Sequence, residues 1–438
     1  MSPSKGRPLA RGRLLALLGI LLCAFSLRSA VASLSPLLDY IAADFTVPTA
    51  VIGLIGTAPP VCFAIFGLAT PLLVRRLGIE RVTVIALAAI AIGLVLRGFF
   101  AGGSVSLLLT TALIFAGVGM GNILVPPLVK KYFTDRIGLM LTLYTTAMAF
   151  STFVPPLVAV PVADAAGWRV SLGLWGVFAI AGAVPWIMML MTGRTSSVES
   201  PVTSLPEPVE GREASIDDPV TLSTGPIAVA PSSARLFGRL MRLPLAWSLA
   251  VVFSTSSIMA YVSFAWLPTI VVDVAGVSAA EAGLLLSLFA VMGLPASLLV
   301  PVLVVRFQAT RGLYAVGAAT GLLGIAGLLF WANPVTIWLW VGLFGIVGVM
   351  FPLALVLISI RSRTPESAVA LSSFVQSTGY VIAAAFPVLI GVLHEATESW
   401  TVPLLVMAAV LVIATPFGYI AGRRRTVEDE WERRHGRW

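Results

Sequence analysis

Twelve apolar stretches constrain this chain more than any other feature of its sequence. About 20 apolar residues in a helix cross the hydrocarbon core of a bilayer, so each stretch is a candidate span. Only 11% of the residues are charged, whereas a soluble domain has about 25%. Only Asn333 and Pro334 separate the ninth and tenth candidates, so this division is the least certain. The predicted spans are 14–38, 50–74, 82–101, 105–129, 137–161, 169–192, 244–270, 279–305, 312–332, 335–358, 366–393 and 401–422.

The positions of the basic residues give an orientation. With a cytoplasmic N-terminus, all but three of the 28 Lys and Arg residues fall in segments that face the cytoplasm, as the positive-inside rule requires. We therefore expect a multi-pass protein of the plasma membrane with both termini inside. The net charge of +8 is spread between spans rather than over one face of a soluble domain, which excludes a nucleic-acid partner.

A polar segment divides the chain into two halves. Residues 193–243 are rich in Ser, Thr, Pro and Glu, a composition typical of disordered linkers. The expected organisation is a basic segment (1–13), a six-helix bundle (14–192), the cytoplasmic linker, a second six-helix bundle (244–422) and a charged tail (423–438). Gly167-Trp168-Arg169 opens the sixth span and Ser399-Trp400 opens the twelfth, a trace of internal repetition.

The N-terminus also imitates a secretory signal peptide. A basic start and an apolar run precede Ala30-Val31-Ala32, which has the small residues of a cleavage site. Arg28 stands just before that site, and cleavage would leave eleven spans. We therefore favour an uncleaved first span.

The reactive side chains needed for catalysis are scarce. Cys23 and Cys62 lie inside apolar runs, so we interpret them as buried free thiols rather than a disulfide. The only histidines are His394, near an outer loop, and His435, in the tail. The sequence shows no metal cluster, nucleophile motif or phosphate-binding loop, so we expect neither an enzyme nor a cofactor.

Arg28 is the most informative single residue. It lies about 20 Å along the first span, deeper than a snorkelling Arg normally starts. A charge inside the membrane costs at least about 2.5 kcal/mol and marks a functional site by default. The functional interpretation is a fixed cation whose planar guanidinium binds an anionic or strongly dipolar solute. The alternative is a structural pairing with helix carbonyls or with Asp39 and Asp44.

The other two arginines outside the cytoplasmic segments have structural interpretations. Arg97 is expected near the outer interface, where its side chain can snorkel to water. Arg169 is expected to anchor the sixth span beside Trp168 at the outer face.

Several polar and aromatic residues recur at helical spacing. Residues four apart share one helix face, and Ser257 and Tyr261 form such a pair, although small hydroxyl residues equally serve helix packing. Asn122 lies among glycines that permit close backbone approach, and its amide needs a partner there. The predicted substrate-binding residues are Arg28, Asn122, Tyr144, Met148, Tyr261, Trp266, Gln376 and Tyr380.

Two six-helix halves joined by a cytoplasmic linker resemble the major facilitator superfamily. The segment after the second span loosely follows the family's gating-loop motif, with Pro71 where an acidic residue is usual. The matching residues are Gly67, Arg75, Arg76, Gly78 and Arg81. The resemblance implies an all-α integral membrane fold of two pseudo-symmetric six-helix bundles.

Short motifs resemble the cyanate and 2-nitroimidazole transporter branch (CynX/NimT) more narrowly. They include Leu27-Arg28 followed by Pro36-Leu37-Leu38, Gly121 to Pro126, Leu143 to Met148, Tyr261 to Pro268 and Gln376 to Tyr380. One departure is Ser254 to Ser257, where the family tends to show a glutamine. The resemblance implies a small polar or anionic solute and leaves the substrate open.

The sequence therefore predicts a secondary transporter, expected as a monomer, that works by alternating access. The main alternative is a proton-driven drug exporter of the same superfamily. All 20 Asp and Glu residues fall in loops, the linker, the tail or helix ends, which leaves no titrating carboxylate inside the bundle. The span 137–161 also lacks the G-x(3)-G-P pattern that marks drug/proton antiporters. A channel or receptor is a more distant alternative.

Overall fold

The computed structural model describes residues 11–133, 137–192, 233–436 and 438. Those residues form helices and no strand, and twelve helical segments among them are long and apolar enough to cross a membrane. The prediction of an all-α membrane fold with twelve spans is confirmed. The two spans expected on either side of Asn333 and Pro334 are separate helices.

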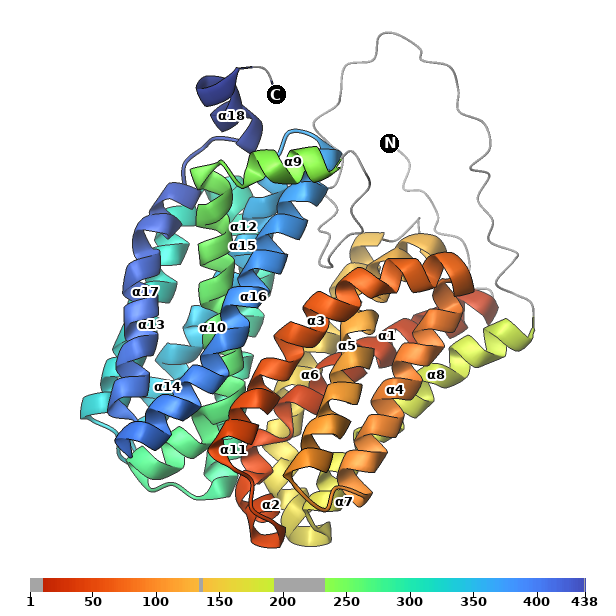
Figure 1. Ribbon diagram of the computed structural model, residues 1–438, viewed down its shortest axis with the longest axis vertical. Coiled ribbons are helices and arrows are strands. Elements are labelled where there is room, and N and C mark those ends of the chain that lie inside the picture. The colour runs from red at the N-terminus through yellow and green to blue at the C-terminus, as the bar shows by residue number, and fades with distance from the viewer. Residues whose placement is uncertain (1–10, 134–136, 193–232, 437) are drawn as a thin grey trace.

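Six spans form the N-terminal half (Figure 1). The first span ends at Ala32, earlier than predicted. If the helix continued, the ring of Pro36 would clash with the carbonyl of Ala32, four residues earlier. A 3-10 turn, η1 (Ser35–Leu37), and a short helix, α2 (Leu38–Asp44), then lead to the second span. The remaining elements are α1 (Arg11–Ala32), α3 (Thr49–Leu77), α4 (Ile79–Phe99), α5 (Ser104–Tyr132), α6 (Ile137–Ala166), and a sixth span broken into α7 (Trp168–Gly173) and α8 (Gly176–Met191).

The C-terminal half repeats this pattern with two broken spans. Its eighth span divides at Met292, and its tenth contains the 3-10 turn η3 (Ile346–Val349). The helices are α10 (Pro244–Ala275), α11 (Ala279–Val291), α12 (Gly293–Phe307), α13 (Thr310–Phe330), α14 (Ile337–Gly345), α15 (Met350–Ile360), α16 (Pro365–Thr397) and α17 (Thr401–Ala421).

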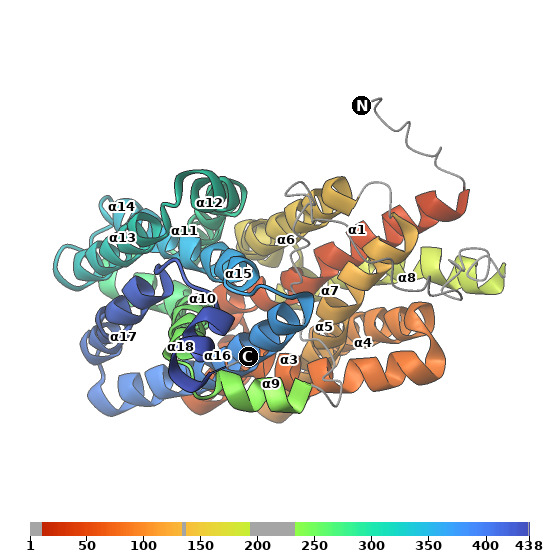
Figure 2. The ribbon, with the colours of Figure 1, turned by 90° about the horizontal axis from the view of Figure 1, so that it is seen from above.

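The two halves lie side by side, as Figure 2 shows in a view along the bundle. Two further helices, α9 (Ser233–Leu240) and α18 (Val427–His435), lie at one end of the molecule, and α2 lies at the other (Figure 1). We call these the α18 end and the α2 end. The ribbons of the two halves diverge toward the α18 end (Figure 1).

One interaction occurs in equivalent places in both halves. In the N-terminal half, the indole nitrogen of Trp168, which begins the sixth span, donates to Asp44 Oδ2 at 3.0 Å. In the C-terminal half, that of Trp400, just before the twelfth span, donates to Asp273 Oδ2 at 2.7 Å. Each tryptophan thus ties the last span of its half to the chain at the end of the first. The trace of repetition in the sequence corresponds to a repeated contact.

The halves join at the α2 end through small residues and backbone carbonyls. Thr57 Oγ1 of α3 donates to the Ala384 carbonyl of α16 at 2.7 Å, and Ser35 Oγ donates to the Ala265 carbonyl of α10 at 3.0 Å. A Cβ atom on Gly53 of α3 would lie 2.8 Å from Val388 Cα. The two halves therefore meet at backbone distance on this side.

Both polar segments outside the bundles carry more structure than expected. Most of the predicted disordered linker lies outside the described residues, but its end forms α9, because the Phe237 ring packs edge-on against Phe374 of α16, 5.3 Å between centroids. The predicted charged tail forms α18, in which Thr426 and Asp429 cap each other reciprocally.

Acidic side chains of α18 dock it on the C-terminal half. Glu430 Oε2 accepts the backbone N–H of Leu245, at the start of α10, at 3.0 Å. The backbone N–H of Thr426 and the guanidinium of Arg363 together lower the pKa of Asp429 to about 2. The tail helix thus connects the start of α10 to the loop before α16.

A glycine pair in α13 tests the packing of this half. A Cβ at Gly324 would lie 2.6 Å from the backbone nitrogen of Phe344 in α14, whereas Gly312 of the same helix has nothing within 4 Å. We expect Gly324→Ala to cost about 1–3 kcal/mol through overpacking and to lower the thermal unfolding midpoint. Gly312→Ala is the matched control and should leave the midpoint unchanged or higher; equal midpoints for the two variants would contradict the packing.

Candidate functional site

A pocket lies between the two halves, on the side of Tyr261 toward the α2 end. Its walls come from both halves and are mainly apolar, with the polar side chains of Ser35 and Tyr261 among them. The lining residues are Ala30, Val31, Leu34, Ser35, Leu38, Ile52, Ile55, Gly56, Pro59, Phe115, Tyr261, Phe264 and Ala265.

Arg28 of α1 reaches across to the other half beside this cavity. Its guanidinium lies close enough to the hydroxyl of Tyr261 in α10 to interact with it electrostatically, and the hydroxyls of Tyr261 and Tyr380 in α16 lie beside each other. Tyr144 of α6 lies close enough to Tyr380 to interact with it electrostatically. Four of the predicted binding residues therefore form one cluster, drawn from four helices of both halves.

No carboxylate pairs with Arg28 in the part of the chain that the structure describes. Asp44, one of the two aspartates considered as its structural partners, instead accepts from Trp168 and lies 3.3 Å from Arg169 Nη2. Arg28 itself is half-buried. The polar neighbours of its charge are therefore neutral tyrosine hydroxyls.

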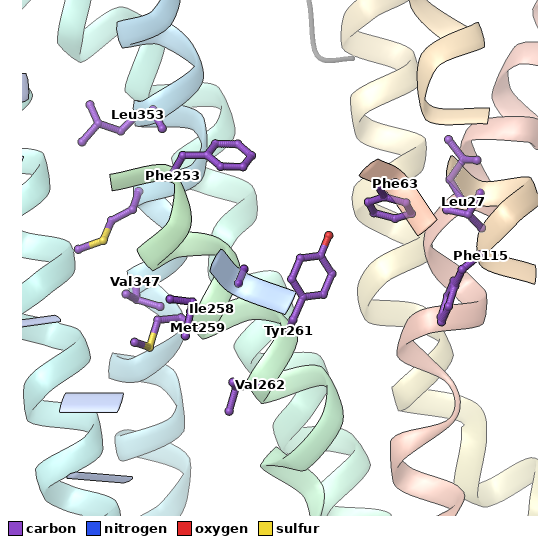
Figure 3. Packing of buried hydrophobic residues seen from close by; sticks show 14 of the residues in the cluster. Leu27, Phe63, Phe115, Phe253, Ile258, Met259, Tyr261, Val262, Val347 and Leu353 are labelled. Carbon is purple, nitrogen blue, oxygen red and sulfur yellow. The ribbon is translucent and has the colours of Figure 1, made fainter. Parts of the chain in front are cut away.

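Aromatic rings surround the tyrosine pair. The ring of Tyr380 lies edge-on to Phe253 (5.1 Å between centroids), to Phe63 of the opposite half (6.0 Å) and to Tyr261 (6.3 Å). Figure 3 shows the Tyr261 ring extending from α10 on the side that faces the N-terminal half, where Phe63, Leu27 and Phe115 lie. Rings from both halves therefore pack around Tyr380.

Sequence reasoning missed the phenylalanines of this shell. Phe63, Phe115 and Phe253 are buried, yet each stands in a uniformly apolar span in which phenylalanine is ordinary. No local pattern distinguishes a ring that faces the cavity from one that faces lipid. Only the packing of the two halves makes that distinction.

The predicted amides lie near the cluster in different settings. Gln376 is buried one helical turn before Tyr380, and its Nε2 donates to Ser372 Oγ at 2.7 Å. Asn122 is half-buried in α5. The preceding Gly121 packs against Leu27, the neighbour of Arg28, because its Cβ would lie 2.5 Å from Leu27 Cδ2. Asn122 is thus placed at the depth of Arg28.

The structure does not bring the other two predicted binding residues into the cluster. Trp266 is buried inside the C-terminal half, where its indole nitrogen donates to the Pro387 carbonyl at 2.9 Å and its ring lies 5.8 Å from that of Trp400. Met148 is half-buried in α6, and its carbonyl accepts from Ser151 and Thr152.

The predicted gating loop joins α3 to α4 at the α18 end. Gly78 has φ +84°, a left-handed conformation that favours glycine, and the side chains of Arg76 and Arg81 are exposed. The side chain of Arg75 and the surroundings of Gly67 lie outside the described residues.

Two polar features near that loop hold the N-terminal half together. Glu80 is buried beside the loop and accepts from Lys131 Nζ and from the Tyr132 hydroxyl, both at 2.7 Å. Arg13 donates to the Tyr132 carbonyl at 3.2 Å. These contacts join the α18 ends of α1, α4 and α5.

The outer arginines differ in how well they were predicted. Arg169 makes structural contacts as expected, donating to the Ala101 carbonyl at 3.1 Å and lying 4.4 Å from the Trp168 ring centroid. The expectation that Arg97 snorkels is wrong. Its side chain is fully buried because α1 and α7 cover the last turn of α4.

The described residues contain no group of three metal-ligating side chains. Cys23 and Cys62 are buried and free, as predicted.

Comparisons with known proteins agree with this architecture. The profile of the Major Facilitator Superfamily matches residues 20–386. The chain is 31% identical over 420 residues to the uncharacterized transporter YycB of Bacillus subtilis (95% of this chain, 96% of that one). It is 30% identical over 426 residues to the 2-nitroimidazole transporter of Escherichia coli (95% and 98%), and 26% identical over 413 residues to that organism's cyanate transport protein CynX (92% and 96%).

Two solved structures share the fold. A bacterial homologue of the human lysosomal transporter Spinster, in an inward-facing and unoccupied conformation, aligns with a TM-score of 0.70 at 16% identity. That alignment covers 96% of this chain and 98% of the other. The nucleoside transporter NupG aligns with a TM-score of 0.68 at 13% identity, over 93% and 99%.

The position of Trp266 leads to a prediction about stability. Trp266→Phe removes the hydrogen bond to the Pro387 carbonyl, and a buried hydrogen bond contributes about 1 kcal/mol. We expect a lower thermal unfolding midpoint in detergent. The matched control is Trp338→Phe, at a position that is 37% exposed, and it should unfold like the parent. If both variants unfold alike, Trp266 does not support the C-terminal half.

Proposed function

Since this transporter belongs to the Major Facilitator Superfamily, we propose that it moves a small anionic or strongly dipolar solute, similar to cyanate or a nitroimidazole, by alternating access. The observation that carries the proposal is the Arg28 guanidinium, which lies beside Tyr261 of the opposite half and is met by no carboxylate among the described residues. Both halves thereby contribute to one binding site.

The chemistry of the cluster supports this class of solute. A guanidinium is planar and presents its N–H donors as a fork that matches planar oxygen acceptors. Tyrosine hydroxyls can donate to the same acceptors without adding charge. The aromatic shell of Phe63, Phe253 and Tyr380 offers faces and edges to a flat solute. The two named relatives from Escherichia coli transport solutes of this kind, as their names state.

The contacts between the halves support alternating access. If both termini are cytoplasmic, as the charge distribution predicts, the α2 end faces outside. The halves touch there through Thr57 and Ser35 and diverge toward the cytoplasmic α18 end (Figure 1). This arrangement corresponds to an inward-facing state, with Arg28 and the tyrosines between the closed and open ends. Transport would require the outer contacts to separate.

One prediction of the proposed function concerns Arg28. Thermal unfolding of the purified protein is measured against cyanate, nitrite and neutral azoles. A solute at 100 times its Kd stabilises the parent by about 2.7 kcal/mol, which shifts the midpoint visibly. We expect Arg28→Gln to lose the shift with anions because the charge and the fork are gone. Arg28→Lys should retain only part of it, because a point charge lacks the fork.

The controls separate binding from folding. Arg76→Gln removes an equal charge at an exposed position in the gating loop and should keep the full anion shift. Should Arg28→Gln fail to fold, Tyr261→Phe keeps the charge and removes one hydroxyl, and it should weaken binding. A shift with neutral azoles that survives Arg28→Gln would contradict the proposal and favour the drug-exporter alternative.

Another prediction of the proposed function concerns the contact between the halves at the α2 end. A side chain at Gly56 would collide with Ala265 and Pro387 of the other half, because even its Cβ would lie 2.7 and 2.8 Å from their Cβ atoms. We expect Gly56→Leu to push the halves apart at this end and to shift the population toward the outward-facing state. Spin labels at the exposed positions 43 and 396 would report a longer distance than in the parent.

Gly102 provides the control for this experiment. It lies exposed in the loop between α4 and α5, and nothing stands within 4 Å of its Cβ position. Gly102→Leu should leave the distance distribution unchanged. An unchanged distance distribution in Gly56→Leu as well would show that this contact does not keep the two halves together at the α2 end.

A further inference from the structure

A second buried arginine lies away from the transport site. Arg97, in the last turn of α4, is 0% exposed. Its Nη2 donates to the Ala30 carbonyl of α1 at 3.2 Å, which supports the C-terminal end of that helix. Its Nε and Nη1 donors meet no acceptor in the part of the chain that the structure describes.

Four other buried side chains of the N-terminal half share this property, and three of them lie toward its α2 end; the fourth, Trp186, lies further along α8 beside Gly19. The hydroxyls of Ser29 and Ser33 and the indole nitrogen of Trp175 have no hydrogen-bond partner among the described residues. Both serines are 0% exposed and Trp175 is 3% exposed. Leaving such groups unpaired costs about 1–3 kcal/mol each, so an additional partner for them would contribute substantially to stability.

Packing contacts bring these groups into one wedge between α1, α4 and the junction of α7 and α8. The Trp175 ring lies 6.3 Å from that of Phe25, one helical turn before Ser29 on α1. The adjacent Gly176 packs against Leu94, one turn before Arg97 on α4, at 3.6 Å from its Cβ position. Arg97 itself reaches α1 at Ala30, between the two serines.

The wedge is rich in donors and positively charged. Arg97 forms no salt bridge among the described residues. Of the acidic groups at this end of the half, Asp44 is engaged by Trp168 and Arg169, and Asp164 accepts from the Tyr40 hydroxyl at 2.5 Å. The guanidinium and the indole can only donate, and the two serine hydroxyls can do so as well. A water molecule would accept some of these bonds but would leave the buried charge uncompensated.

We propose that Arg97, Ser29, Ser33 and Trp175 bind a small monovalent anion such as chloride. The anion accepts from Nε and Nη1 of Arg97, from the indole and from the hydroxyls, and it neutralises the guanidinium. It fastens the end of α1 to α4 and to the junction of α7 and α8. The surrounding helices enclose this site, so a free inorganic ion rather than a lipid headgroup is the ligand.

This anion site is distinct from the cluster around Arg28. Phe25, Ser29 and Ser33 follow one another at helical spacing on the face of α1 toward α8, where Phe25 lies 4.5 Å from the Phe178 ring. Val31 and Ser35 continue the face that carries Arg28 and border the cavity between the halves. The anion site therefore does not rest on the proposed transport function.

The test measures chloride binding to the full-length protein in detergent. Equilibrium dialysis with radioactive chloride, in gluconate buffer of constant ionic strength, gives the affinity and stoichiometry. Thermal unfolding with chloride replacing gluconate gives the effect on stability. Both are measured on the parent and on Arg28→Gln, so that chloride bound at the transport site is identified separately. We expect a saturable site and a midpoint several degrees higher in chloride, both retained in Arg28→Gln.

Variants of the wedge decide the assignment. Arg97→Met should abolish the site and the chloride-dependent rise in midpoint. Should Arg97→Met fail to fold, Trp175→Phe and Ser33→Ala each remove one donor and keep the charge, and each should weaken chloride binding about tenfold. The proposal would be overturned if chloride binding is unchanged in both Trp175→Phe and Ser33→Ala. It would also be overturned if Arg28→Gln loses the site or if the parent does not bind chloride.

Discussion

The organisation of this molecule depends on one positive charge in the interior of an apolar bundle. A guanidinium at membrane depth costs at least about 2.5 kcal/mol unless polar groups meet it. Arg28 of α1 is met by Tyr261, which belongs to the other half of the molecule. A costly group of the N-terminal half thus lies beside polar side chains of the C-terminal half, and the proposed binding site lies where the two halves would move against each other.

The contacts that close the α2 end are suited to being broken. They consist of hydroxyl–carbonyl bonds, from Thr57 to Ala384 and from Ser35 to Ala265, and of glycines against backbone. Each such bond contributes about 0.5–1.5 kcal/mol, and water can replace it when the halves separate. Inside each half, the contacts are stronger. Trp168 and Trp400 bind carboxylates, and Lys131 pairs with the buried Glu80.

The sequence predicted the parts of this structure that depend on local periodicity. Span positions follow from runs of about 20 apolar residues, and the depth of Arg28 follows from counting along one helix. Tyr261 and Tyr380 could be predicted as site residues for a similar reason, because spacing by four places side chains on one helix face. Contacts between segments that are distant in the chain could not be predicted from the sequence. The position of Trp266 depends on its contact with α16, and the burial of Arg97 depends on α1 and α7. In the sequence, Phe115, which lines the pocket, looks like any lipid-facing phenylalanine.

Helix α1 connects the proposed binding site with the packing of the N-terminal half. It carries Arg28 itself, and it accepts a hydrogen bond from Arg97 of α4. On one side it carries Arg28 to the tyrosines of the C-terminal half. On the other side its last turn accepts from the buried Arg97 of α4, and Phe25 packs against Trp175 and Phe178. A binding arginine is useful in alternating access only if its helix moves with its own half. The contacts behind α1 hold it to the N-terminal half, so under the proposed function the guanidinium would change position together with that half.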